Sequence, residues 1–427
     1  MNQSIETFFA RMSARHSRCF WLDGAGGRTW SGSRSMIGWL DDADVSISFN
    51  ASSRQVTRHT GASSETVGDD VFNALEHEIQ SGPPDAQWFG YFGYSSRGDL
   101  PAHVDTEQAD AVWMRPSRVH VFEHSPIDPR LRARSSPAPV MPDLIDPREY
   151  RAAFAAVQEQ LHAGNSYEVN LTYRVTTSSP VSPTAAYLRL RSLNPAPYAG
   201  FIQHDVPGAR SWLLSSSPER YARIGDDRVI EARPIKGTTP RGQSQAEDQQ
   251  LREQLARDPK FRAENLMIVD LLRNDLATVC QFGTVTVPDL MFVESYESVH
   301  QLVSTVQGQL RPDMTTVGAI RKLFPAGSMT GAPKRRTMEI IRSVEPTPRG
   351  PYAGAFGWIG ADGRADLGVV IRSLTTAGDG QWRLGTGGGI IVHSTVEDEL
   401  AESSWKAARL LEALAGFRKD EHSTVGV

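Results

Sequence analysis

The sequence contains little cysteine, no long apolar run and no excess of positive charge. Only Cys19 and Cys280 occur among 427 residues, too few for a disulfide framework or a cysteine-based zinc site, and we expect both to be packing residues. No run approaches the ~20 apolar residues of a membrane helix, and residues 1–10 show no apolar signal core, so we expect a cytoplasmic protein without membrane partners. The net charge of −5 and the pI near 6.1 provide no general cationic surface for nucleic acid or anionic lipid. Any anion-binding site must therefore be local, which fits a small acidic substrate.

Proline-rich residues 125–147 show little apolar periodicity and predict a linker. We expect an N-terminal α+β subdomain at residues 1–124, a catalytic domain at residues 148–418 and a polar tail at residues 419–427. Hairpin-like strands mix with helices instead of alternating strictly with them, which predicts an α+β fold with an antiparallel core. Periodicity predicts helices at 71–80, 148–163, 246–255, 260–276, 316–323, 332–343 and 397–415. It predicts strands at 88–94, 118–122, 167–173, 211–215, 228–232, 285–287, 352–359, 367–374 and 382–386.

Lys236 lies in Arg-Pro-Ile-Lys-Gly-Thr, followed by Thr239 and Pro240. Prolines and glycines restrict the backbone on both sides, which predicts a stiff loop that presents the lysine. An amine is a nucleophile only when neutral, and a nearby cation such as Arg233 or Arg241 would lower its pKa. The alternative is a solvated lysine in a turn.

The C-terminal helix carries Glu399, Glu402 and Lys406 at spacings that place them on one face. Alone, this pattern is also typical of an ordinary surface salt bridge. The preceding Gly-Thr-Gly-Gly-Gly segment at 385–389 predicts a strand that ends in a glycine loop, where backbone amides approach an anion. Glu264 lies on an otherwise apolar helix and needs a partner if buried. Glu264, Glu399 and Glu402 together would form an oxygen-only site, which suits Mg²⁺.

Further blocks carry polar residues with two interpretations each. Glu219 in Ser-Ser-Ser-Pro-Glu-Arg is a candidate acid or base, or a turn acid. His300 is a candidate catalytic residue, or a hydrogen-bonded core histidine. The block Phe-Pro-Ala-Gly-Ser-Met-Thr-Gly-Ala-Pro-Lys at 324–334 offers the hydroxyls of Ser328 and Thr330 to an anionic or hydroxylated ligand.

In this order, from residue 148 to 406, the blocks resemble the chorismate-utilising enzymes. Arg-Pro-Ile-Lys-Gly-Thr resembles the loop of aminodeoxychorismate synthase component I, whereas anthranilate synthases typically carry alanine at the position of Lys236. The resemblance implies two large antiparallel sheets packed face to face with flanking helices. It also implies that chorismate and ammonia form 4-amino-4-deoxychorismate, on the route to 4-aminobenzoate and folate. A glutamine amidotransferase partner would supply the ammonia, since the sequence shows no glutaminase motif, and a separate lyase would consume the product.

The resemblance also implies roles for single residues. Lys236 would add covalently to the ring while Glu219 assists loss of the hydroxyl, and His300 would line the site. Glu264 and Glu402, with Glu399 nearby, would hold Mg²⁺. The substrate-binding set would be Thr238, Ser328, Thr330, Tyr352, Arg372, Gly387, Gly388 and Lys406.

The sequence departs from the family pattern at several positions. Trp21-Leu-Asp-Gly24 replaces the Leu-Leu-Glu-Ser element of tryptophan-regulated anthranilate synthases, although Asn194-Pro-Ala-Pro-Tyr198 is retained in form. Glu168 replaces a common glutamine, and Val396 a frequent proline. Isochorismate and salicylate synthases tend to carry a water-activating lysine where this chain has Glu168. An anthranilate synthase large subunit remains the nearest alternative, followed by an isochorismate or salicylate synthase and by a non-catalytic chorismate sensor.

Overall fold

The computed structural model describes residues 4–24, 33–124, 144–296 and 299–415. The expected tail at 419–427 and most of the expected linker, residues 125–143, lie outside the described residues. Helices occur at α1 (Ile5–Arg15), α2 (Val71–Ser81), α3 (Pro147–His162), α4 (Pro183–Leu193), α5 (Gln245–Arg257), α6 (Pro259–Ala277), α7 (Thr316–Leu323), α8 (Lys334–Val344) and α9 (Val396–Leu414), with short 3₁₀ turns η1 (Tyr94–Ser96) and η2 (Gly327–Met329).

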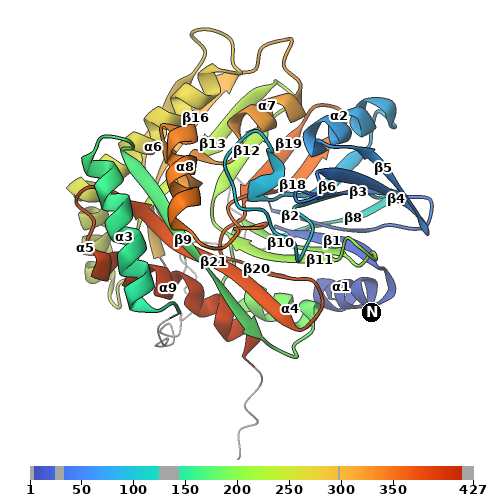
Figure 1. Cartoon of the computed structure of the whole chain (residues 1–427), viewed down its shortest axis with the longest axis horizontal. Helices are drawn as coiled ribbons and strands as arrows, with labels where there is room; N and C mark the ends of the chain where they lie inside the picture. Colours follow the sequence, from blue (N-terminus) through green and yellow to red (C-terminus); the bar gives the residue numbers. More distant parts are fainter. Residues whose placement is uncertain (1–3, 25–32, 125–143, 297–298, 416–427) are drawn as a thin grey trace, which may run out of the picture.

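Two large antiparallel sheets form the centre of the molecule (Figure 1), as expected. The described part of the first sheet has nine strands in the order β17 (Gly331–Ala332), β9 (Glu168–Ser178), β21 (Gln381–Ile390), β20 (Ser373–Thr376), β11 (Ser211–Ser217), β10 (Tyr198–His204), β1 (Arg18–Asp23), β2 (Arg34–Trp39) and β8 (Arg118–Glu123).

The described part of the second sheet runs in the order β14 (Ile235–Pro240), β16 (Val299–Gln309), β13 (Val229–Arg233), β12 (Arg220–Ile224), β19 (Ala365–Val369), β18 (Ala355–Gly360), β6 (Gln87–Phe92), β7 (Ala111–Arg115), β3 (Val45–Asn50), β4 (Gln55–Thr60) and β5 (Ser63–Gly68), with β15 (Thr286–Ser295) on β16. Strands from the first 124 residues therefore occur in both sheets. The division into two domains stays a prediction.

The two sheets pack face to face through large apolar side chains. Phe20 of β1 stacks on Phe89 of β6 at a ring-centroid distance of 4.0 Å, and both are fully buried. Helices α1, α4 and α9 cover the outer face of the first sheet, and α2, α6 and α7 pack on the second. Burial of these aromatic and aliphatic groups supplies most of the favourable free energy of folding.

Local signals fix the helices that border the site. Asp258 caps α6 by accepting from the Phe261 amide, and Pro259 occupies the first turn. Thr395 caps α9, whose first turn holds three acidic residues that oppose the helix dipole. Most predicted elements are confirmed, and helix 316–323 has the predicted bounds. The single strand predicted at 367–374 is wrong, because the chain leaves β19 and turns at Arg372 (φ +50°) before it enters β20.

Cys19 and Cys280 are both buried and unpaired by disulfide, as expected for packing residues. None of the helices in the described ranges is long and apolar enough to cross a membrane.

Candidate active site

A cavity of about 460 Å³ lies where strands of both sheets meet helices α6 and α9. It is large enough for a small organic ligand. Of the predicted site residues it is lined by Glu219, Lys236, Thr238, Glu264, Ser328, Tyr352, Arg372, Gly387, Gly388, Glu399, Glu402 and Lys406. Most of the predicted site residues therefore line one cavity, although they are up to 187 positions apart along the chain, from Glu219 to Lys406.

Lys236 lies in strand β14, not in the loop that the prolines and glycines predicted. The strand pairs with β16 and contains a bulge between Ile235 and Thr238, where Gly237 adopts a φ of +92°. This bulge directs Lys236 into the cavity, and Pro240 ends the strand as expected.

The sequence alone leaves open whether arginines lower the pKa of Lys236 or glutamates raise it, and the structure favours the glutamates. Arg233 pairs with Glu294 and Arg241 with Asp248, so neither guanidinium contacts the amine. Burial opposes the charged form of Lys236, but Glu168, Glu264 and Glu219 outweigh that effect and raise the pKa of the amine. In this structure the lysine is therefore a protonated group paired with Glu168.

Glu219 is a buried carboxyl beside the lysine. Burial raises its pKa to about 7, while a hydrogen bond from Ser328 Oγ to Glu219 Oε1 at 2.6 Å acts in the opposite direction. A carboxyl that titrates near neutral pH holds a proton that it can donate and later recover.

Glu264 and Glu399 lie on either side of one ammonium group. Lys260 Nζ is 4.0 Å from Glu264 Oε1 and 3.6 Å from Glu399 Oε1. Burial raises the pKa of Glu264 to about 7 and also raises that of Glu399, because Lys260 offsets their charge only in part. Glu402 instead pairs with Lys406 at 2.8 Å. Within the described ranges, no group of three or more His, Cys, Asp or Glu residues is gathered closely enough to be ready to hold a metal ion.

These carboxylates nevertheless fit a hard cation. Their donor atoms are oxygens only, two of the groups are buried with raised pKa values, and a positive charge between them would favour their ionised forms and so oppose that shift. Lys260, four residues before Glu264 on α6, was not predicted, although its spacing is a helix-pair signal.

The glycine segment 385–389 is also part of a strand, contrary to the predicted amide loop. It pairs with β9 in continuous register from Gly385↔Arg174 to Gly389↔Asn170. Its glycines provide space for side chains: a Cβ at Gly388 would lie 2.9 Å from Glu399 Oε2, and one at Gly385 would enter the Tyr352 ring. Lys406 Nζ donates to the Gly387 carbonyl at 2.8 Å, so it is more than a surface salt-bridge partner.

Arg372 is a cation without a carboxylate partner within hydrogen-bonding distance in the described residues. Its guanidinium lies 5.2 Å from the Trp405 ring centroid, and burial lowers its pKa. Tyr352 lines the cavity from the facing wall. An anionic ligand would compensate Arg372, which makes this wall the place for a carboxylate. Trp405 was not predicted, because a single aromatic residue on an amphipathic helix gives no distinctive signal.

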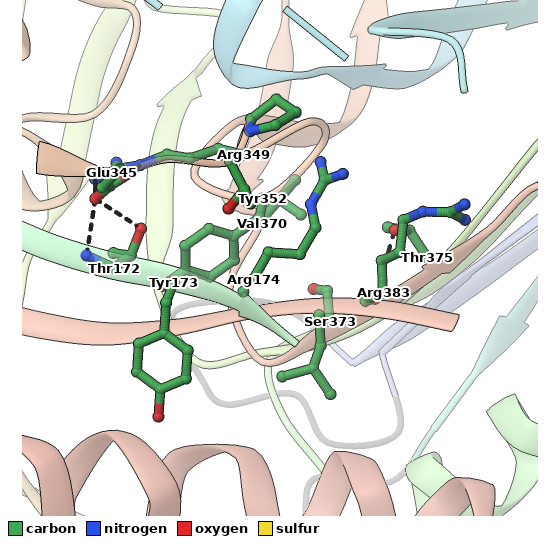
Figure 2. Close-up of a pocket in the computed structure, with 14 residues that line it drawn as sticks. Thr172, Tyr173, Arg174, Glu345, Arg349, Tyr352, Val370, Ser373, Thr375 and Arg383 are labelled. Atoms are coloured by element: carbon green, nitrogen blue, oxygen red, sulfur yellow. Dashed lines mark hydrogen bonds and ion pairs between the residues drawn. The ribbon is translucent and has the colours of Figure 1, made fainter. Parts of the chain in front are cut away.

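The buried ion pair of Arg349 and Glu345 holds residues that line the cavity. Arg349 donates to the carbonyls of Met329 at 2.7 Å and Asn170 at 2.8 Å, two residues that line the cavity. Glu345 pairs with Arg349 and accepts from the amide and hydroxyl of Thr172 (Figure 2). The pair holds the backbone of Met329 and Asn170 where these residues line the cavity.

His300 and Thr330 do not line the cavity. His300 Nε2 is 3.1 Å from Asp248 Oδ1 and its Nδ1 is 2.8 Å from Ser295 Oγ, while the next residue, Gln301, lines the cavity from the other face of β16. Thr330 is fully buried and donates to backbone carbonyls of its own turn. His300 therefore fits the alternative of a hydrogen-bonded core histidine, and the hydroxyl of Thr330 is satisfied by its own turn.

The fold and this site define a chorismate-binding enzyme. The chain matches the chorismate binding enzyme family over residues 17–412 and belongs to that family. It is 39% identical to aminodeoxychorismate synthase of Streptomyces pristinaespiralis over an alignment of 420 residues, which covers 86% of this chain and 57% of that protein.

Two component 1 proteins are similar at nearly equal identity. Aminodeoxychorismate synthase component 1 of Escherichia coli (strain K12) is 42% identical over 266 residues, covering 62% of this chain and 57% of that protein. Anthranilate synthase component 1 of Thermus thermophilus is 41% identical over 265 residues, covering 62% and 56%. The chain thus spans little more than half the length of these relatives. Overall identity does not separate the two activities.

Solved structures share the fold. Anthranilate synthase component I of Streptococcus pneumoniae superposes with a TM-score of 0.72 at 24% identity, covering 89% of this chain and 92% of that one. The menaquinone-specific isochorismate synthase MenF of Escherichia coli gives 0.71 at 20% identity, covering 97% and 92%.

Proposed function

We propose that this chain is the chorismate-aminating component of an aminodeoxychorismate synthase. It converts chorismate and ammonia to 4-amino-4-deoxychorismate. The observation that carries the proposal is Lys236, an amine in the cavity with the protonatable Glu219 beside it. A reacting ring between them meets a nucleophile and a proton donor at once.

The carboxylate-binding wall orients the substrate. Arg372, Tyr352 and Lys406 receive the carboxylates of chorismate, while Thr238 and Ser328 line the same space. Lys236, once neutral, adds to the ring as Glu219 protonates the departing hydroxyl, which leaves as water. Ammonia then displaces the lysine at the carbon that bore the hydroxyl, and the transferred ammonium returns one proton to Glu219.

Glu264, Glu399 and Glu402 would hold Mg²⁺. When bound, the ion supplies positive charge that clamps a substrate carboxylate and offsets the charge of these three groups. The oxygen-only donors and the raised pKa values of Glu264 and Glu399 support this assignment.

Ammonia comes from a glutamine amidotransferase partner, and a separate lyase takes the product on to 4-aminobenzoate. The component 1 name of the Escherichia coli relative supports a two-component enzyme. Cytoplasmic localisation and a role in folate synthesis remain predictions.

Anthranilate formation is the second candidate, supported by the identity to the Thermus thermophilus relative. A product assay with purified protein, chorismate, Mg²⁺ and ammonium at alkaline pH separates the two. We expect no fluorescent anthranilate, and 4-aminobenzoate only after an aminodeoxychorismate lyase is added. Anthranilate formed without the lyase would refute the proposal.

A further inference from the structure

Lys236, which lines the cavity, pairs with a carboxylate of the opposite sheet. Glu168 is the first residue of β9 in the nine-stranded sheet, whereas Lys236 belongs to β14 at the edge of the other. Glu168 Oε1 accepts a hydrogen bond from Lys236 Nζ, and both side chains are largely buried, with exposed fractions of 2% and 12%. The two groups therefore form an ion pair that links the sheets at the reaction site.

The second oxygen of Glu168 is buried and has no hydrogen-bond partner in the described residues. A fully ionised carboxylate in such a place pays the desolvation cost of that oxygen. A protonated carboxyl can instead carry its proton on either oxygen. The unbonded oxygen of Glu168 therefore has its lone pairs available to a proton.

Gly389 creates the space in which the pair meets. A Cβ at this position would lie 2.0 Å from Glu168 Oε1 and 2.8 Å from Lys236 Nζ. No side chain fits between Gly389 and the pair, so the contact between amine and carboxylate is direct.

Other charged groups face the lysine without contacting it. Glu264 lies on α6 and Glu219 precedes β12, and both raise the pKa of Lys236 less than Glu168 does. Glu402 faces it from α9 but pairs with Lys406, and Lys260 bridges Glu264 and Glu399. Glu168 is the carboxylate that can take a proton from Nζ without either group moving.

We propose that Glu168 is the proton acceptor that converts Lys236 from an ammonium into a nucleophilic amine. The inference rests on the proposed function only in assigning the reaction that this amine performs. The proton passes from Nζ to Glu168, which leaves a neutral amine beside a neutral carboxyl. The amine then bonds to the ring carbon as the hydroxyl leaves with the proton of Glu219. When ammonia displaces the lysine, the freed amine recovers its proton from Glu168.

This arrangement has a distinctive pH dependence. The form in which the amine is neutral and Glu168 holds the proton has a constant population while the pair holds one proton, because no proton enters or leaves the pair when this form arises. With glutamine at 168 the lysine must release its proton to solvent. Its neutral fraction then rises up to tenfold for each pH unit below its pKa.

The test measures Lys236 acylation by acetic anhydride in the absence of chorismate. The modified peptide is quantified by mass spectrometry between about pH 7 and pH 9, below the usual lysine pKa. Exposed Lys322 on α7 serves as an internal reference for ordinary lysine titration in the same samples. We expect the profile of the wild-type protein to be shallower than that of Glu168→Gln, which should rise up to tenfold per pH unit.

Equal slopes at Lys236 in the two proteins, whether steep or flat, would overturn the inference. Glu168→Asp is the second variant, because it keeps the charge but withdraws the carboxylate by one methylene, and we expect its profile to become steep as well. Since no chorismate is present, the result does not depend on the proposed function. Failure of that function would appear instead as the absence of aminodeoxychorismate in the product assay.

Discussion

Ser328 Oγ donates to Glu219 Oε1 over 2.6 Å, so a turn in the segment between α7 and α8 controls the acidity of a carboxyl just before β12. Ser328→Ala removes a bond that favours the charged form, and the pKa of Glu219 then rises above about 7. A neutral-to-charged hydrogen bond is worth about 1.5 kcal/mol, which corresponds to about one pKa unit.

The account requires protonated Glu219, so activity in single-turnover experiments should fall as pH rises through its pKa. In Ser328→Ala this fall should move to higher pH by about one unit. Ser343→Ala is the matched control, since among the described residues that hydroxyl bonds only to the Ile340 carbonyl of its own helix. An alkaline limb that stays in place in Ser328→Ala would count against Glu219 as the acid.

The proposed metal site predicts that two isosteric changes weaken Mg²⁺-dependent activity without unfolding the protein. Glu264→Gln and Glu402→Gln each remove one charge from the site and should cost several kcal/mol of transition-state stabilisation when Mg²⁺ is present. Circular dichroism should show that both variants are folded. Titration calorimetry in the presence of chorismate should show weakened Mg²⁺ binding, and wild-type affinity in both variants would refute the assignment.

A buried histidine pair predicts acid sensitivity of the fold. Burial, with a contribution from Arg18, lowers the pKa of His59 to about 4, and burial lowers that of His204 to about 3. Both pKa values lie below the unfolded value near 6.5, so the unfolded chain binds more protons as pH falls. The contribution of these two histidines to the free energy of unfolding is complete above about pH 6.5 and is lost on acidification towards pH 4.

Each histidine should cost up to about 1.4 kcal/mol per pH unit in this window. Urea unfolding at pH 7 and pH 5 measures the loss. The slope should be smaller in His59→Gln and His204→Gln than in the wild type, while His77→Gln, an exposed residue of α2, should leave it unchanged. A slope that survives in both buried variants would contradict this origin.

The sequence predicted those site residues that have a distinctive local pattern. Glu264 is a lone acid on an otherwise apolar helix, and Glu399, Glu402 and Lys406 share one face of α9, so periodicity marked them as candidates. The family resemblance then assigned them to one site. Prolines and glycines around Lys236 and at 385–389 predicted loops, yet both segments are strands. Pairing with β16 and β9 decided the backbone there, and such long-range pairing has no local signal.

Contacts between segments that are far apart in the sequence were also not predicted. The pKa of Lys236 depends on Glu168, which lies 68 positions earlier in the chain, and Arg349 supports the cavity through the Asn170 carbonyl. Arg233 and Arg241, close in sequence, are instead neutralised by Glu294 and Asp248. Sequence proximity therefore could not decide the sign of the electrostatic field at the lysine.

In the proposed reaction Lys236 is a covalent nucleophile, and two substitutions of this residue test that role. Lys236→Ala removes the amine but keeps Arg372, Tyr352 and Lys406, so chorismate should still bind while formation of aminodeoxychorismate is lost. Residual amination should shift towards the carbon attacked in anthranilate synthesis. Lys236→Arg should not restore activity, because a guanidinium stays protonated.

The most direct measurement is intact-protein mass spectrometry of the wild-type chain quenched with chorismate and Mg²⁺ in the absence of ammonia. The account predicts an adduct of chorismate minus water that maps to Lys236 after digestion and disappears when ammonium is added. It predicts no such adduct in Lys236→Ala. Absence of the adduct, together with aminodeoxychorismate formation by Lys236→Ala at near the wild-type rate, would contradict it.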